Sequence, residues 1–165
     1  MSDAGEFVDY TLQRESSWEK AYENRERAGD GVEVYGASVG AVRGTVRDAL
    51  KRYKDLGHDD ITALSSELWS TPVFERRLAA VVLLQTKVGV LVNTDLTRIE
   101  GFLRQAGTGN LADPLALDVV RPLVERLQGQ AKVRAGKVLE RWAQDPDPAL
   151  RRASALASGR QPPLD

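Results

Sequence analysis

Apolar residues recur at three- and four-residue steps along most of this chain, which is the period of an amphipathic helix. The first clear run begins after Ser38 and ends near Gly57, so it has a capping residue before it and a glycine after it. Further runs follow over about 59–70, 73–84, 93–107, 114–129, 131–143 and 149–157. Residues 88–92 are rich in valine, but no similar run could pair with them as a strand, so we expect a helix end and a loop there. The pattern predicts an all-α fold.

Two of the expected helix pairs resemble each other in sequence. Residues 67–79 (ELWSTPVFERRLA) and 140–153 (ERWAQDPDPALRRA) each end one helix on a tryptophan, turn through proline and open the next helix with two arginines. About 73 residues separate the two tryptophans, which leaves room for two hairpins between equivalent points, as in HEAT or armadillo arrays. We therefore expect HEAT-like antiparallel hairpins stacked into a short curved solenoid, with Trp69 and Trp142 buried at equivalent places.

The bulk properties are those of a soluble globular protein with a single core. The 165 residues suit one domain, and we expect a polar segment at 1–33 that is partly helical or disordered, a repeat domain at 34–157 and a tail at 158–165. No apolar run approaches the roughly 20 residues that a membrane span requires. The chain has no cysteine and its N-terminus does not resemble a signal peptide, so we expect a cytoplasmic protein.

Charge is unevenly distributed around a formal net charge of −1. Residues 1–33 hold nine acidic and four basic side chains, whereas residues 121–160 hold nine basic and four acidic ones. This basic stretch is a weak indication of a polyanionic partner, because solvated helix faces often carry such an excess. His58 has no second histidine and no cysteine to join it, so we expect an ordinary loop histidine and no metal.

A candidate functional carboxylate, Asp113, lies in the stretch Gly107–Val120, which begins with two closely spaced glycines. Pro114 follows it directly and suits the first turn of a helix, because proline presets φ and lacks an N–H that would be unpaired there. We therefore expect Asp113 at a helix N-terminus, either as a simple N-cap or as a functional acid. The helix that follows should direct Leu117 and Val120 inward.

From about Tyr35 to Ala157 the chain resembles the AlkD-like DNA alkylation repair proteins, which are alkylpurine DNA glycosylases built of HEAT-like repeats. The resemblance is carried by Tyr35-Gly36, by ELW at 67–69 with ERR at 75–77, by ADPLA at 112–116, and by Trp142 with RRA at 151–153. It implies that Asp113 is the essential acid beside the sugar of the lesion and that Arg152 contacts the DNA backbone. Gly109 stands where the family places a tryptophan of the lesion cleft. We expect a C-terminally shortened family member that also lacks a second cleft tryptophan.

The resemblance predicts a DNA alkylation repair protein that binds duplex DNA on a concave basic face and acts as a monomer, without cofactor, metal or membrane, near the nucleoid. Whether it hydrolyses the N-glycosidic bond of alkylated purines stays open. The alternative is a non-catalytic HEAT-like scaffold that binds DNA or protein and in which Asp113 is only a cap. In the first case Asp113 would be catalytic, and the phosphate ligands would be Arg152, Arg151, Arg77, Arg43 and Arg47.

Overall fold

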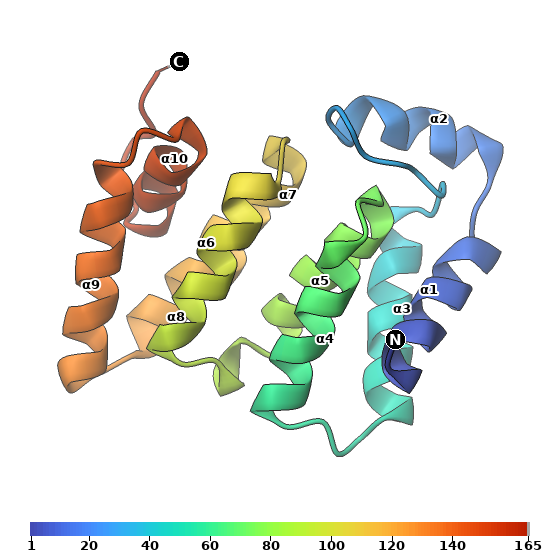
Figure 1. Cartoon of the computed structure of the whole chain (residues 1–165), viewed down its shortest axis with the longest axis horizontal. Helices are drawn as coiled ribbons and strands as arrows, with labels where there is room; N and C mark the ends of the chain where they lie inside the picture. The colour runs from blue at the N-terminus through green and yellow to red at the C-terminus, as the bar shows by residue number, and fades with distance from the viewer. Residues whose placement is uncertain (165) are drawn as a thin grey trace. The chain divides into compact units, whose positions relative to one another are not determined.

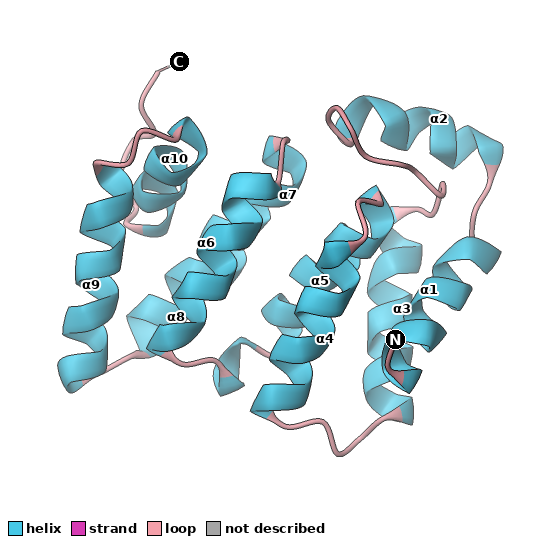
Figure 2. Ribbon diagram, viewed as in Figure 1, coloured by secondary structure: helices cyan, strands magenta, loops and turns pink. Residues whose placement is uncertain are grey.

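The computed structural model describes residues 1–164, which fold into helices joined by short connections (Figures 1 and 2). Within these residues there is no strand, and a single isolated bridge pairs Glu33 with Val73. The predicted all-helical fold is thus confirmed, and residues 88–92 hold the short 3₁₀ helix η1 (Val88–Val90) instead of a strand. None of the helices in the described part is long and apolar enough to span a membrane.

The chain divides into two compact units, and the first comprises Met1–Lys87. Its helices are α1 (Asp3–Arg14), α2 (Trp18–Arg27), α3 (Val39–Arg52), α4 (His58–Ser70) and α5 (Phe74–Thr86). Helices α4 and α5 form a hairpin, α3 packs beside α5, and α1 contacts α3, α4 and α5 (Figure 1). The first dozen residues, for which the sequence left helix and disorder open, therefore form a helix that is part of the packing.

The buried carboxylate of Glu75, near the start of α5, connects several segments of the first unit. Its side chain is fully buried and accepts hydrogen bonds from the backbone N–H groups of Tyr35, Gly36 and Ala37 at 2.8, 2.8 and 3.3 Å. The amide of Asn24 on α2 donates a further bond of 2.7 Å. A carboxylate held by several N–H donors can be buried without a cation, so Glu75 joins α2, the loop at 35–37 and α5.

The second unit comprises Val88–Asp165, described to residue 164. After η1 and η2 (Asn93–Asp95) its elements are α6 (Leu96–Gln105), α7 (Gly109–Leu115), the π-helical turn η3 (Ala116–Val120), α8 (Arg121–Arg126), α9 (Gly129–Ala143) and α10 (Pro148–Ala157). Helices α9 and α10 form a hairpin, and α10 also packs on α6, α7 and η3.

Each of the two similar sequence segments forms a hairpin with a buried tryptophan near the end of its first helix. Trp69 lies at the end of α4 and is 1% exposed, and Trp142 lies at the end of α9 and is 0% exposed. The indole N–H of Trp142 donates to Oε1 of Glu100 at 2.6 Å, which satisfies its only polar atom. The predicted burial of both tryptophans is confirmed.

Candidate functional site

The start of α7 differs from the sequence prediction. Thr108 is the N-cap, since its hydroxyl accepts a 3.3 Å hydrogen bond from the backbone N–H of Asn110. Asp113 lies a full turn further on, and Pro114 stands inside the helix. The prediction that Asp113 caps the helix was therefore wrong. Thr108, which Gly107 at φ +68° precedes, starts the helix earlier, and Pro114 in the helix interior forgoes one helical hydrogen bond because it has no N–H.

Asp113 instead pairs with Arg152 on α10, which approaches from 39 residues further along the chain. The guanidinium binds the carboxylate in a two-pronged geometry, with Nε to Oδ1 at 2.9 Å and Nη2 to Oδ2 at 3.0 Å. The side chains of Asp113 and Arg152 are 31% and 45% exposed, so the pair is open to solvent and to a ligand. The structure thus brings together two of the residues to which the family resemblance assigns a role.

Gly109 lies one helical turn before Asp113, directly beside its carboxylate. A Cβ atom built on Gly109 would stand 3.5 Å from Oδ2 of Asp113, which is an ordinary contact distance. The position at which the family resemblance anticipates a tryptophan thus borders the carboxylate, and in this chain no side chain extends from it toward Asp113.

The neighbouring arginine, Arg151, is used to shape the α9–α10 turn. Its Nη1 donates to the carbonyl oxygens of Asp145 and Pro146 at 2.8 and 2.9 Å. Asp147 caps α10 by accepting from the N–H of Ala149 at 2.9 Å, and Pro148 occupies the first turn. These contacts hold the beginning of α10, and hence Arg152, in a defined position.

Arg77 is likewise engaged within the fold. Its guanidinium carbon lies 4.9 Å from the ring centre of Trp69, and its Nε donates to the carbonyl oxygen of Trp69 at 3.1 Å. Partial burial lowers the pKa of Arg77 from its ordinary value. Arg76, the other member of this arginine pair, is buried and bonded to Asp9 at 2.9 Å. Arg76 and Arg77 are therefore both less exposed than Arg152.

Most basic side chains of residues 121–160 form hydrogen bonds or ion pairs inside the second unit. Arg141 binds Glu100 at 2.9 Å, for example, and Arg126 donates to the carbonyl oxygens of Val88 and Leu91. Further cations of the stretch with a partner are Arg121, Lys132, Arg151, Arg152 and Arg160. Counting basic residues in the sequence therefore overstates the number of cationic side chains that are available to bind a polyanion in this stretch.

The first unit presents a groove in which cations converge. It has a volume of about 360 Å³ and is lined by Leu50, Val82 and Thr86 with the four cations Arg43, Arg47, Lys51 and Lys87. Of these, Arg47 lies 3.5 Å from the carboxylate of Asp48 in an exposed pair, which is a weak interaction. The sequence pattern placed Arg43 and Arg47 together on one helix face, but it missed Lys87, which the packing of α5 on α3 brings to the same groove. We call this feature the α3–α5 groove.

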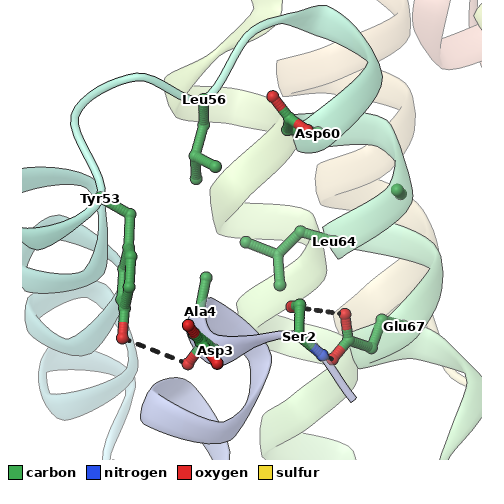
Figure 3. Close-up of a pocket in the computed structure, with 9 residues that line it drawn as sticks. Ser2, Asp3, Ala4, Tyr53, Leu56, Asp60, Leu64 and Glu67 are labelled. Carbon is green, nitrogen blue, oxygen red and sulfur yellow. Dashed lines mark hydrogen bonds between the residues drawn. The ribbon is translucent and has the colours of Figure 1, made fainter.

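A second hollow of the first unit, of about 230 Å³, lies between α1, the end of α3 and α4 (Figure 3). Its floor is apolar, with Leu56 and Leu64, and its polar groups are largely carboxylates. Glu67 accepts hydrogen bonds from both the backbone N–H and the hydroxyl of Ser2, each of 2.7 Å. An acidic hollow repels phosphate, so this pocket is not a candidate site for a nucleic acid.

His58 begins α4, and its Nδ1 lies 2.8 Å from Oδ1 of Asp59. No group of three or more potential metal ligands occurs among the residues that the structure describes.

Comparison with known proteins places the pair and the groove in a family context. A family model described as "DNA alkylation repair enzyme" matches residues 8–159, which is most of the chain and includes the α3–α5 groove, Asp113 and Arg152. No match was found among curated proteins.

Proposed function

Because the chain belongs to the DNA alkylation repair enzyme family, we propose that it binds duplex DNA on a concave basic face of stacked HEAT-like hairpins and hydrolyses the N-glycosidic bond of alkylated purines. The observation that carries this proposal is the solvent-open pair of Asp113 and Arg152. The proposed setting is the cytoplasm, at the nucleoid.

The chemistry suits a site with one carboxylate. Alkylation at N3 or N7 leaves the purine cationic, so the glycosidic electron pair leaves with a base that becomes neutral and needs no proton. The sugar develops oxocarbenium character, which the carboxylate of Asp113 would stabilise electrostatically while it orients the attacking water and accepts its proton. Glycosidases that expel a poor leaving group need a second carboxylic acid, and this reaction does not.

Arg152 connects this chemistry with DNA binding. While it holds both oxygens of Asp113, the pair is neutral overall and stabilises a cation less than a free carboxylate would. A duplex phosphate offers the guanidinium a competing anion of suitable geometry. In the proposal, Arg152 stays with Asp113 on undamaged duplex and moves to phosphate only at a lesion, which leaves the negative charge of Asp113 uncompensated beside the sugar.

The α3–α5 groove supports the binding half of the proposal. Arg43, Arg47 and Lys51 stand at successive four-residue steps on one helix, so they span about 12 Å along its axis. A regular row of cations suits the regular phosphates of a strand, and Lys87 adds a fourth charge from α5. We assign Arg151 and Arg77 to structural support, because their guanidinium groups are bonded to backbone carbonyls.

The second candidate function is a non-catalytic scaffold, and the observation in its favour is Gly109. Glycine beside Asp113 leaves no aromatic face against which an extruded sugar or base could pack. In that case the pair would serve only to join α7 to α10.

Base release distinguishes the two functions. Duplex DNA containing N7-methylguanine or N3-methyladenine is incubated with the wild type and with Asp113→Asn, and free base is measured. The proposed glycosylase releases base, and Asp113→Asn loses this activity while its melting temperature stays close to that of the wild type. Duplex binding without base release from either lesion would favour the scaffold.

A further inference from the structure

Helix α2 carries its large aromatic residues on the outside. Trp18 is 78% exposed and Tyr22 is 73% exposed, and since they stand four residues apart they share one helix face. The only buried residue of this helix is polar, Asn24. An ordinary surface helix has the opposite arrangement, with apolar residues inward and polar residues outward.

The inner face of α2 is held by close polar and small-residue contacts that do not involve the two aromatic rings. Gly36, at φ +106°, approaches so closely that a Cβ there would lie 2.4 Å from the backbone oxygen of Ser17 and 2.9 Å from Ala21. The N–H of Ser17 in turn donates to the oxygen of Gly36 at 3.0 Å. Asn24 binds the oxygen of Ala37 at 2.7 Å as well as Glu75. The helix is thereby fixed in place, and Trp18 and Tyr22 add nothing to the core.

The two rings share the outer side of α2 with two carboxylates. Glu19 and Glu26 lie on the outer side of α2, both are exposed, and neither forms an ion pair among residues 1–164. Of the basic residues of α2, Arg25 turns its Nη2 back to the carbonyl oxygen of Val32, and Lys20 pairs with Glu23. Fixed aromatic rings beside uncompensated carboxylates attract cationic side chains through ion pairs and through the π face of tryptophan.

We propose that the outer face of α2, formed by Trp18, Tyr22, Glu19 and Glu26, is a docking surface for a basic segment of another protein. The same carboxylates repel a nucleic acid backbone, and two copies of this face brought together would oppose like charges, so the charge selects a cationic partner. Glu19 and Glu26 are two turns apart, about 10 Å along the helix, which suits lysine or arginine side chains seven residues apart on a helical partner. Apolar side chains between those cations would then cover Trp18 and Tyr22.

Labelled peptides test this proposal. One is an alanine-based helical peptide with lysines seven residues apart and leucines between them, and the control peptide has glutamate in place of each lysine. Fluorescence anisotropy of the labelled peptide measures affinity for the full chain. We expect the lysine peptide to bind, and Trp18→Ala, Tyr22→Ala and the double variant Glu19→Gln/Glu26→Gln each to weaken it about tenfold or more. Val133→Ala, at an exposed apolar residue of α9, should leave the affinity unchanged.

Thermal melting separates docking from folding, since both aromatic side chains are exposed and their removal should leave the melting temperature within a degree or two. The proposal is overturned if the lysine peptide does not bind, if the glutamate peptide binds equally well, or if Trp18→Ala has no effect. It is also overturned if Trp18 fluorescence responds to duplex DNA, or if sedimentation shows self-association that Trp18→Ala removes.

Discussion

Removing Asp113 should strengthen the hold of this protein on undamaged duplex DNA, although the proposed function makes Asp113 part of the DNA site. In the free protein both oxygens of Asp113 are bonded to Arg152 at 2.9 and 3.0 Å. An arginine held in this way contributes little to phosphate binding. Asp113→Ala releases the guanidinium from this carboxylate and also removes a negative charge that a phosphate would otherwise meet.

The magnitude follows from counting phosphates. One additional phosphate contact steepens the dependence of log K on log salt by about 0.9. Between 50 and 200 mM salt, Asp113→Ala should therefore lose about threefold more affinity than the wild type does. The cost in folding stability should be small, at most about 1 kcal/mol, because the pair is partly exposed and Asp113 does not cap its helix.

A double-mutant cycle provides the assay. Duplex affinity is measured against salt for the wild type, Asp113→Ala, Arg152→Ala and the double variant. Arg152→Ala should matter little in the wild-type background, where the arginine is engaged, and should abolish the gain in the Asp113→Ala background. If Arg152→Ala weakens binding equally in both backgrounds, then Asp113 does not restrain Arg152 and the reasoning fails.

Three further predictions concern the framework of the site. Thr108→Ala should lower the free energy of unfolding by about 1 kcal/mol in chemical denaturation, since it removes the N-cap of α7, and an unchanged midpoint would contradict the cap. Glu75→Ala should cost roughly 3 kcal/mol or more, because it leaves several buried N–H donors unpaired, and a near-neutral result would show that water replaces the carboxylate. Burial by itself raises the pKa of Asp9, but hydrogen bonds from Tyr35 and Arg76, with the charge of Arg76, bring it below the ordinary 3.8. The contribution of Asp9 is therefore complete above about pH 4 and is lost as the pH falls further, so Asp9→Asn should flatten the acid limb of stability against pH, and an unaltered limb would rule this out.

The net pKa shift of Tyr35, the hydrogen-bond partner of Asp9, is in the opposite direction. Burial, together with the hydrogen bond to Asp9, raises the pKa of Tyr35 to about 12. At neutral pH, where Asp9 is ionised, Tyr35 therefore keeps its proton and its 2.7 Å hydrogen bond to Asp9.

The local sequence pattern was sufficient to locate helices and several of their ends. Ser38 caps α3 as predicted, by accepting from the N–H of Ala41 at 3.0 Å, and Gly107 follows α6 with a positive φ. Residues within one or two turns of each other decide such features, so the 3.6-residue period and the capping residues are enough to find them. The same holds for the burial of Trp69 and Trp142 on the apolar sides of their helices.

The period failed where the backbone departs from it. Leu117 was predicted to face inward, but it is 38% exposed, because it lies in the π-helical turn η3. A π turn adds a residue to the helical repeat, which rotates the side chains that follow. Pro114, predicted to lie in the first turn of a helix, stands inside α7 and precedes this turn.

Only tertiary structure decided which charges remain available for a ligand. Nine basic residues between 121 and 160 indicated a polyanion site, yet most of them bind carboxylates or carbonyl groups of the second unit, as Arg141 and Arg126 do. Lys87, which gave no signal in the sequence, joins Arg43 and Arg47 because α5 packs beside α3. The helix pattern depends on neighbours three or four residues apart, whereas the charge of a surface depends on partners that packing brings together from forty residues away.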